Sequence, residues 1–388
     1  MIQPPSLEEL RTAGVLRPID YYFARSTSRL ASESTPQIVL AAALTSSRIG
    51  EGHVCLELAE LAGTSPELDL GSPRRYPELE AWLEALRQSP MVSAGDAPTP
   101  LVLTSAGRLY LRRYWLHERF LAEQISARAS AVDADAGAGN ILETLFPGAG
   151  PDDKQRQAAV LASKHPFAVV SGGPGTGKTF TVVKILALLV EQALAAGKPP
   201  PRMTLLAPTG KAAARLVESI QNAKGALPCS DAVKDAIADE ASTIHRALGS
   251  IPGSSTRFRH NKDNPLVTDL LLVDEASMVN VALMSRLLEA VPAHARFILL
   301  GDKDQLASVE AGAVLGDICN TSAKFSETET RPKIADCVTH LTKSYRYQAG
   351  SGIEALALAI NAGDSTTAIE VLTNRRYPDV SLRPSLPG

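Results

Sequence analysis

Apolar residues along the first third of the chain recur at helical spacing. Residues 38–44 are rich in Ala and Leu, and residues 108–124 place Leu, Trp and Phe among charged side chains, as an amphipathic helix does. Ser6 stands three residues before Glu9, a pattern typical of a capped helix start. We therefore predict a small, mainly helical N-terminal domain over residues 1–128.

The pattern changes after residues 129–140, which are low in bulky side chains and which we interpret as a linker. Beyond it, short apolar runs each lead through a polar turn into a helical segment. The strand-like runs are residues 167–171, 203–207, 269–273 and 296–300. Repeated β-then-α units predict an α/β fold with a parallel sheet covered by helices on both faces. Residues 220–268 interrupt this alternation and are expected to be an insertion.

The net charge, the cysteines and the lack of a long apolar run limit the kinds of protein that this chain can be. The chain has 388 residues, of which 45% are hydrophobic, and its net charge is −3, so a DNA contact requires a local basic track rather than an overall positive field. The four cysteines are scattered without a C-x-x-C pair and are expected to be buried free thiols in a reducing compartment. Neither a signal peptide nor an apolar run of about 18 residues is visible, so we expect a cytoplasmic protein without a membrane segment.

Residues 171–179 match the pattern G-x-x-x-x-G-K-[ST] between a strand-like run and a helical one. The glycines let backbone N–H groups curl around an anion, and the helix start adds the positive end of its dipole. We expect Lys178 to reach the β- and γ-phosphates of a nucleotide, and the hydroxyl of Thr179 to hold Mg²⁺. The residues expected to contact the nucleotide here are Gly172, Gly173, Pro174, Gly175, Thr176, Gly177, Lys178 and Thr179.

Two carboxylates, Asp274 and Glu275, follow the strand-like run that ends at Val273. Ligands of parallel sheets sit at the carboxyl ends of strands, which places both carboxylates at the predicted site. We expect Asp274 to hold Mg²⁺ through water, and Glu275 to orient and deprotonate the attacking water. Gln305, beyond the next strand-like run, can bond the γ-phosphate or that water. Taken alone, these clusters also fit a solvated strand end and a Gly-Asp turn.

Tyr345 and Arg346 form a further cluster. Arg346, supplied from a second lobe, could neutralise charge on the transferred phosphoryl group, and Tyr345 could stack on a base. On composition alone, a surface strand explains the same residues.

Two segments could contact a nucleic acid. Thr209, Gly210 and Lys211 follow a strand-like run and offer a hydroxyl, a backbone N–H and an ammonium, which suit a phosphate oxygen. His245 lies in the second segment, residues 243–246. The alternatives are a helix start with solvated bases for the first segment and a hydrogen-bonded structural histidine for the second.

Taken in order, these motifs resemble the superfamily 1 helicases and, within them, the RecD family, the alpha subunits of the RecBCD enzyme (exodeoxyribonuclease V). Gln155 fits the glutamine with which the family reads adenine. The likeness reaches into the N-terminal region and covers most of the chain. It is carried by residues 16–20, 50–56, 108–112, 171–179, 243–246, 258–260, 273–278 and 301–318.

The resemblance implies a RecA-like ATP-binding domain over residues 141–340 and the start of a second RecA-like domain over residues 341–388. It implies ATP and Mg²⁺ as cofactors and a 5′→3′ motor on single-stranded DNA. It also implies that the N-terminal domain docks onto RecB-like and RecC-like subunits of a helicase–nuclease that acts in double-strand break repair and recombination. Family members continue well beyond the Tyr345 cluster, whereas 42 residues follow Arg346 here, so we expect a truncated chain that binds ATP but lacks a complete motor.

Two other functions compete with the motor. A scaffold subunit with a non-essential nucleotide site would use the same N-terminal domain. Four residues argue against it because hydrolysis alone needs them: Lys178, Asp274, Glu275 and Gln305. A P-loop enzyme of another kind, such as a small-molecule kinase, leaves Gln305 and Tyr345 unexplained.

Overall fold

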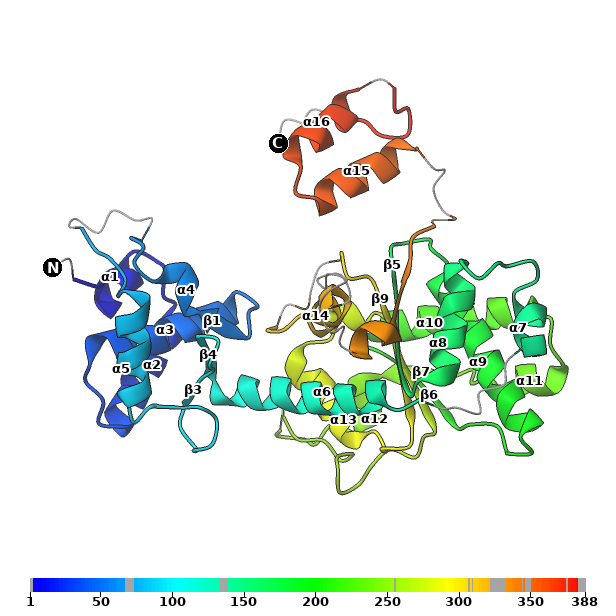
Figure 1. Ribbon diagram of the computed structural model, residues 1–388, viewed down its shortest axis with the longest axis horizontal. Helices are drawn as coiled ribbons and strands as arrows, with labels where there is room; N and C mark the ends of the chain where they lie inside the picture. Colours follow the sequence, from blue (N-terminus) through cyan, green and yellow to red (C-terminus); the bar gives the residue numbers. More distant parts are fainter. Residues whose placement is uncertain are drawn as a thin grey trace. The chain divides into compact units, whose positions relative to one another are not determined.

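The described residues of the chain form two compact units (Figure 1). The structure is a computed structural model, and it describes residues 3–66, 73–132, 139–254, 256–305, 308, 310–321, 333–343, 345, 350–374 and 376–382. Unit 1 consists of Met1–Gln124, Val279–Leu288 and Ala307–Val314. Unit 2 consists of Ile125–Met278, Glu289–Leu306 and Leu315–Gly388.

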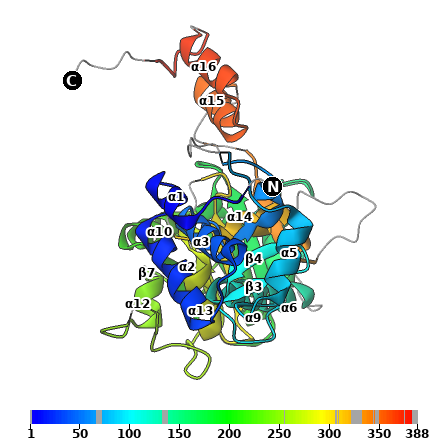
Figure 2. The same ribbon diagram turned by 90° about the vertical axis from the view of Figure 1, so that its left-hand side faces the viewer.

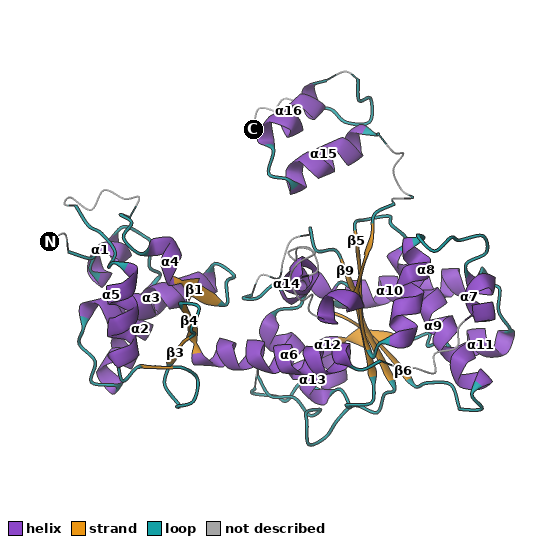
Figure 3. Ribbon diagram, viewed as in Figure 1, coloured by secondary structure: helices purple, strands orange, loops and turns teal. Residues whose placement is uncertain are grey.

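Unit 1 is mainly helical, with one small sheet added (Figure 3). Its helices include α1 (Leu7–Thr12), α2 (Pro18–Leu30), α3 (Pro36–Gly50), α4 (Leu58–Leu61) and α5 (Leu79–Gln88). The strands β1 (Cys55–Glu57), β2 (Val92–Ser93), β3 (Leu101–Leu103) and β4 (Arg108–Leu111) pair in the order β1-β4-β3-β2. The predicted helix start is confirmed, because Ser6 and Glu9 form a reciprocal capping box.

The expectation of a single helix over residues 108–124 is wrong at its start. Arg108–Leu111 forms β4, which pairs antiparallel with β1 and β3, and helix α6 (Arg112–Ser130) begins only after it. Leu109, Tyr110 and Leu111 are all buried. Three consecutive buried residues suit a strand that is covered on both faces, whereas an amphipathic helix would expose one of them.

The core of unit 1 surrounds Trp82 of α5, whose side chain is 0% exposed. Its ring stacks on that of Tyr76 with centroids 6.2 Å apart, and its Nε1–H donates to the carbonyl of Gln37 at 2.9 Å. The indole therefore contributes apolar area to the core while its one polar atom keeps a partner.

Two pieces from later in the sequence belong to unit 1. One contains most of helix α13 (Val281–Ala290), and Oγ of its Ser285 lies 3.0 Å from Nδ1 of His117. The other contains Gly312, whose N–H donates to the carbonyl of Gly52 at 3.0 Å. Unit 1 is therefore completed by residues that lie far beyond position 128 in the sequence.

Unit 2 contains a six-stranded parallel sheet, which confirms the predicted α/β fold class. Its strands are β5 (Phe167–Gly172), β6 (Met203–Ala207), β7 (Ala241–Thr243), β8 (Leu270–Val273), β9 (Arg296–Gly301) and β10 (Val338–Leu341). They lie in the order β10-β5-β9-β8-β6-β7, and each neighbouring pair is parallel. Residues 220–268 are not simply an insertion, because β7 lies within them and adds an edge strand.

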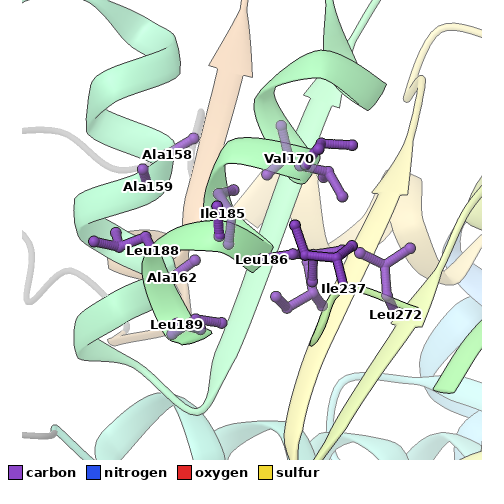
Figure 4. Packing of buried hydrophobic residues seen from close by; sticks show 14 of the residues in the cluster. Ala158, Ala159, Ala162, Val170, Ile185, Leu186, Leu188, Leu189, Ile237 and Leu272 are labelled. Atoms are coloured by element: carbon purple, nitrogen blue, oxygen red, sulfur yellow. The ribbon is translucent and has the colours of Figure 1, made fainter. Parts of the chain in front are cut away.

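Alternate residues of the strands point into a hydrophobic cluster on one face of the sheet (Figure 4). There, Ala158 of α8 and Leu186 of α9 pack with Val170 and Leu272 of the sheet. The helices that contribute to this layer are α7 (Gly139–Leu145), α8 (Lys154–Lys164), α9 (Lys178–Ala195), α10 (Gly210–Gly225) and α11 (Asp231–Ala236). The small alanines of α8 let that helix approach α9 closely.

The opposite face of the sheet is also buried. Phe167 and Phe297, on neighbouring strands, stack with ring centroids 6.1 Å apart and are both 0% exposed. Helix α14 (Val314–Thr321) packs close to Gly301, where an added Cβ would lie 2.5 Å from Cδ2 of Leu315. Both faces of the strands are thus covered, as their continuous apolar sequences predict.

Helices α15 (Gly352–Asn361) and α16 (Ser365–Thr373) pack against each other near the end of the chain. The carboxylate of Asp379 accepts from the N–H groups of Gly352 and Ile353, both at 3.0 Å, and so caps α15.

Three further expectations concern the chain as a whole. Of the linker expected at residues 129–140, residues 133–138 lie outside the described part, and α6 and α7 occupy its two ends. None of the four cysteines, all of which lie within the described residues, forms a disulfide; Cys319 and Cys337 are buried, whereas Cys55 and Cys229 are partly exposed. Among the described residues, no helix has the length and apolar character that spanning a membrane requires.

We predict that the Leu186→Ala substitution lowers the free energy of unfolding by about 2–5 kcal/mol, because Leu186 is 0% exposed in the main cluster of unit 2. Leu194→Ala provides the control on the same helix, since Leu194 is 41% exposed and its loss is expected to cost less than about 1 kcal/mol. Urea denaturation followed by circular dichroism measures both values. Equal effects of the two substitutions would contradict the packing of α9.

Candidate functional site

A glycine-rich loop connects the buried strand β5 to helix α9, as the sequence predicts. Gly175 and Gly177 have φ values of +79° and +80°, a left-handed conformation that glycine adopts without strain. A Cβ on Gly177 would lie 2.7 Å from Nε2 of Gln155, and one on Gly172 would lie 2.6 Å from Oγ1 of Thr176. The loop is therefore a backbone cradle at a helix N-terminus. Its N–H groups have no partners within the helix and can donate hydrogen bonds to an anion.

Lys178 and Thr176 hold the loop in its curled form. Oγ1 of Thr176 donates to the carbonyl of Gly173 at 2.9 Å. The ammonium of Lys178 donates to the same carbonyl at 3.2 Å and to that of Gly172. The positive charge of Lys178 therefore lies inside the loop, where a nucleotide's phosphates fit.

Gln155 and Tyr345 both contact this loop. The amide Nε2 of Gln155, on the first turn of α8, lies 3.5 Å from the carbonyl of Thr176. The backbone N–H of Tyr345 donates to the carbonyl of Gly175 at 2.8 Å, and its ring lies 3.8 Å from the Cβ position of Gly177. Tyr345 is 61% exposed, and the ammonium of Lys343 lies over its ring, 5.1 Å from the centroid. Arg346, expected to act beside it, lies outside the described residues.

The carboxylates Asp274 and Glu275 lie directly after β8. Burial raises the pKa of Asp274 to about 6, and the negative charge of Glu275 adds to this, while an N–H from Glu275 and the charge of Lys178 oppose it. That N–H donates to Oδ1 of Asp274 at 2.9 Å. Glu275 has a φ of +51°, a strained value for a residue with a side chain.

These groups fit a magnesium ion bound together with phosphates. Within the described ranges, no three His, Cys, Asp or Glu side chains cluster as a metal site made by protein alone. Mg²⁺ typically keeps several waters and binds through one or two protein oxygens plus substrate phosphates. Asp274 and the hydroxyl of Thr179, on the first turn of α9 beside the loop, provide that kind of donor set.

Asp302 is a residue of this site that the sequence analysis missed. Its side chain follows β9, is 4% exposed, and has Oδ2 4.0 Å from the Cβ position of Gly173 in the phosphate loop. Oδ1 accepts from the N–H of Asp304 at 3.1 Å, while its carbonyl accepts from the N–H of Gln305 at 3.3 Å. A Gly-Asp pair after an apolar run was the only signal for it, and that pair reads equally well as an exposed turn.

The sheet order explains how these residues meet. Strands β5, β9 and β8 are neighbours, so their carboxyl ends lie side by side at one edge of the sheet. This edge brings the phosphate loop, the carboxylate pair and Asp302 together. Gln305 belongs to the same edge through its backbone bond to Asp302, and its exposed side chain is free to meet a ligand.

The candidate nucleic-acid residues follow the next two strands, β6 and β7. Figure 2 labels α10 and α12, the helices that begin after these strands. Thr209 caps α10 by accepting from the N–H of Ala212 at 3.2 Å, and Gly210 and Lys211 are exposed on its first turn. His245 is exposed on the short helix α12 (Ile244–Leu248) after β7. Because β6 and β7 pair in parallel, the two helix starts are adjacent, and both present N–H groups to solvent.

Two protein-family models match separate parts of the chain. The family model described as "RecBCD enzyme subunit RecD, N-terminal domain" matches residues 12–110. The model described as "AAA domain" matches residues 155–311, which include the phosphate loop and both carboxylates.

Curated relatives align with almost the whole chain. The RecBCD enzyme subunit RecD of Mycolicibacterium smegmatis is 42% identical and covers 93% of this chain and 60% of its own length. The subunit of the same name from Haemophilus influenzae is 34% identical, with 96% and 64% covered. The ATP-dependent RecD2 DNA helicase of Deinococcus radiodurans is 39% identical over 58% of this chain and 28% of its own. The chain thus spans about 60% of the length of the first of these relatives.

Solved structures give a weaker likeness. The Pif1 helicase from Candida albicans is 17% identical, covers 55% of this chain and 44% of its own, and reaches a TM-score of 0.27.

We predict that Gly177→Ala strongly weakens nucleotide binding, because a residue with a Cβ adopts the φ of +80° only with strain, and because the amide of Gln155, 2.7 Å from the Cβ position, must move. Gly197→Ala is the matched control, because Gly197 also has positive φ (+68°) but has no atom within 4 Å of its Cβ position. The control is expected to lose about 1 kcal/mol of stability and to keep its nucleotide. Thermal shift with and without Mg²⁺ and an ATP analogue measures both, and retained nucleotide-dependent stabilisation in Gly177→Ala would contradict the cradle.

We also predict that Asp274→Asn stabilises the nucleotide-free chain at neutral pH. The folded chain raises the pKa of Asp274 from 3.8 to about 6, so it favours the neutral acid. Stability present below pH 3.8 is therefore lost as the pH rises through about 6. The variant avoids this loss and should gain about 1–2 kcal/mol at about pH 7.5 relative to about pH 4.5.

Denaturant titrations at the two pH values test this expectation. Asp235→Asn serves as the control, because Asp235 is exposed on α11 and forms no ion pair among the described residues. An Asp274→Asn gain that did not depend on pH, or that the control matched, would show that desolvation of the carboxylate is not its cause.

Proposed function

We propose that this chain, which is related to RecD subunits along 93% of its length, binds and hydrolyses ATP with Mg²⁺ and belongs to a DNA helicase. The observation that carries the proposal is the meeting of the phosphate loop with Asp274, Glu275 and Asp302 at one sheet edge. A docking scaffold needs no such arrangement, and the shift of the pKa of Asp274 and the strain at Glu275 both oppose folding.

Each group at the edge has a role in this proposal. The loop N–H groups and Lys178 bind the phosphates, and Gln155 and Tyr345 hold the adenine base. Asp274 and Thr179 hold Mg²⁺, which on binding neutralises charge on the phosphates and helps the leaving group depart. Asp274 does so as the carboxylate, a form that Lys178 favours electrostatically.

Glu275 is the proposed general base for hydrolysis. Its positive φ turns the chain sharply after β8, and the backbone N–H of Glu275 is used by Asp274, so the two carboxylates take different directions and different roles. Gln305 senses the γ-phosphate, since its backbone is fixed to Asp302 while its side chain remains exposed. Arg346 would neutralise charge on the transferred phosphoryl group.

The finer parts of the function rest on the relatives. We propose that the helicase to which this chain belongs moves 5′→3′ on single-stranded DNA, which Thr209, Gly210, Lys211 and His245 contact. We propose that residues 1–128 dock onto RecB-like and RecC-like subunits of an exodeoxyribonuclease V type of enzyme for double-strand break repair, and that residues 341–388 belong to a second RecA-like domain. The cytoplasmic location stays a prediction from sequence.

We predict that Lys178→Gln lowers ATP hydrolysis by roughly 10²–10³-fold, because it removes a preorganised positive charge from the phosphates. The experiment places the variant in the assembled helicase–nuclease, with the other motor subunit inactivated, and measures ATP turnover and DNA unwinding. Lys198→Gln, on the exposed segment after the far end of α9, is the control and should change neither rate.

Unchanged unwinding by Lys178→Gln in this assembly would favour the alternative, a scaffold subunit whose nucleotide site is not essential. Loss of unwinding together with normal assembly would support the motor. Assembly is scored separately by size-exclusion chromatography, so that a docking defect is not read as a catalytic one.

A further inference from the structure

A loop rich in basic residues follows α12. This basic loop, residues 256–262, carries Arg257, Arg259 and Lys262 around Phe258. We propose that the basic loop binds the phosphate backbone of single-stranded DNA and extends the contact made by α10 and α12. The inference rests on the proposed DNA-binding function and adds a binding element to it.

The loop is fixed to the helix that carries His245. The N–H groups of Arg259 and His260 donate to the carbonyls of Gly249 and Leu248, both at 2.9 Å. The rings of Phe258 and His245 meet edge to face with centroids 5.9 Å apart. A ligand that contacts the exposed His245 is therefore close to the start of the loop as well.

Asparagine side chains hold the loop in a defined shape. Nδ2 of Asn264 donates to the carbonyl of Arg259 at 2.9 Å, and Nδ2 of Asn261 lies 3.3 Å from the carbonyls of Phe258 and Arg259. Oδ1 of Asn261 accepts from the N–H of Asp263 at 2.9 Å. A loop that is ordered before binding loses less conformational entropy when a ligand arrives.

The three cations of the loop are exposed, and none forms an ion pair within the described part of the chain. Elsewhere in unit 2, Arg202 pairs with Asp269 at 2.8 Å and Lys224 with Asp239 at 2.6 Å. In a chain of net charge −3, three unpaired cations within six residues form a local positive site. Such a site attracts a polyanion whose charges are spaced along a chain.

The position of the loop favours DNA over an acidic protein surface as that polyanion. Thr243, the N-cap of α12, pairs in register with Ala207, two residues before the N-cap of α10. The exposed Lys211 and Arg246 lie on these two helices and, like the loop, form no ion pair among the described residues. The unpaired cations thus run from α10 across α12 into the basic loop, as a track for successive phosphates requires.

The test compares single-stranded DNA binding by the 388-residue chain and by its Arg257→Ala/Lys262→Ala variant at several salt concentrations. Each phosphate contact on single strands contributes about 0.7 to the slope of log affinity against log salt, so the variant's slope should be smaller by about 1.4. Arg29→Ala/Lys198→Ala removes two exposed cations elsewhere that form no ion pair with any described residue, and it should keep the parent's slope. Arg259 is left intact because its side chain packs on Gly249.

Oligothymidylates of about 4 to about 16 nucleotides sharpen the comparison. The variant should match the parent on the shortest strands and fall behind on longer ones, because the loop lies beyond α12 along the track. Arg257→Lys/Lys262→Arg keeps both charges and should keep the slope, which separates loss of charge from loss of folding.

The outcomes separate this inference from the function on which it rests. If the parent chain itself fails to bind single-stranded DNA, the proposed function is wrong. If the parent binds, but the alanine variant has the slope of the Arg29→Ala/Lys198→Ala control, the loop does not touch DNA and only this inference is overturned. A reduced slope restored by the conservative variant supports it.

Discussion

The phosphate loop leaves no room for a side chain at Gly172, where an added Cβ would lie 2.9 Å from the carbonyl oxygen of Leu341, and the rest of the candidate site depends on this close packing. Because its glycines carry no side chains, the loop can curl around a small space, and its N–H groups together with the ammonium of Lys178 define what that space binds. Neighbouring strands then determine which other groups reach that space: β8 brings a carboxylate pair, and β9 brings Asp302. Both faces of the sheet are buried, so strand register is strongly specified. The packing of the core therefore also determines the geometry of the candidate site.

Strand β8 has an aspartate just outside each of its ends, and the two differ in electrostatic state. Asp269, before the strand, accepts from the guanidinium of Arg202 at 2.8 Å, which holds the pKa of its carboxyl well below its usual range. Asp274, after the strand, has no such cation bonded to it, and burial raises its pKa. The first carboxylate stabilises the fold at neutral pH, whereas the second destabilises it until a cation arrives. This contrast distinguishes a structural aspartate from one suited to a ligand.

The sequence predicted elements that are long enough to show a pattern: helices buried along one face, and strands in which several consecutive residues are buried. It missed the shortest strands. Strands β5, β6, β8 and β9 were visible as apolar runs bounded by turns. Strand β7 is the three residues Ala-Ser-Thr, and the strands of unit 1 have two to four residues, too few for a period to show. Asp302 was missed for a different reason. Its burial depends on residues distant in sequence, which no local pattern records.

Unit 1 is assembled from three separate stretches of the chain, and this has a consequence for how the protein can be divided. A polypeptide cut at the end of α6 would carry helices α1–α6 but neither α13, with its Ser285, nor Gly312. His117 and the carbonyl of Gly52 would then lose the partners that reach them from beyond the nucleotide motifs. The N-terminal part of this chain is thus no detachable module. It is complete only together with residues that follow the phosphate loop and the carboxylate pair in the sequence.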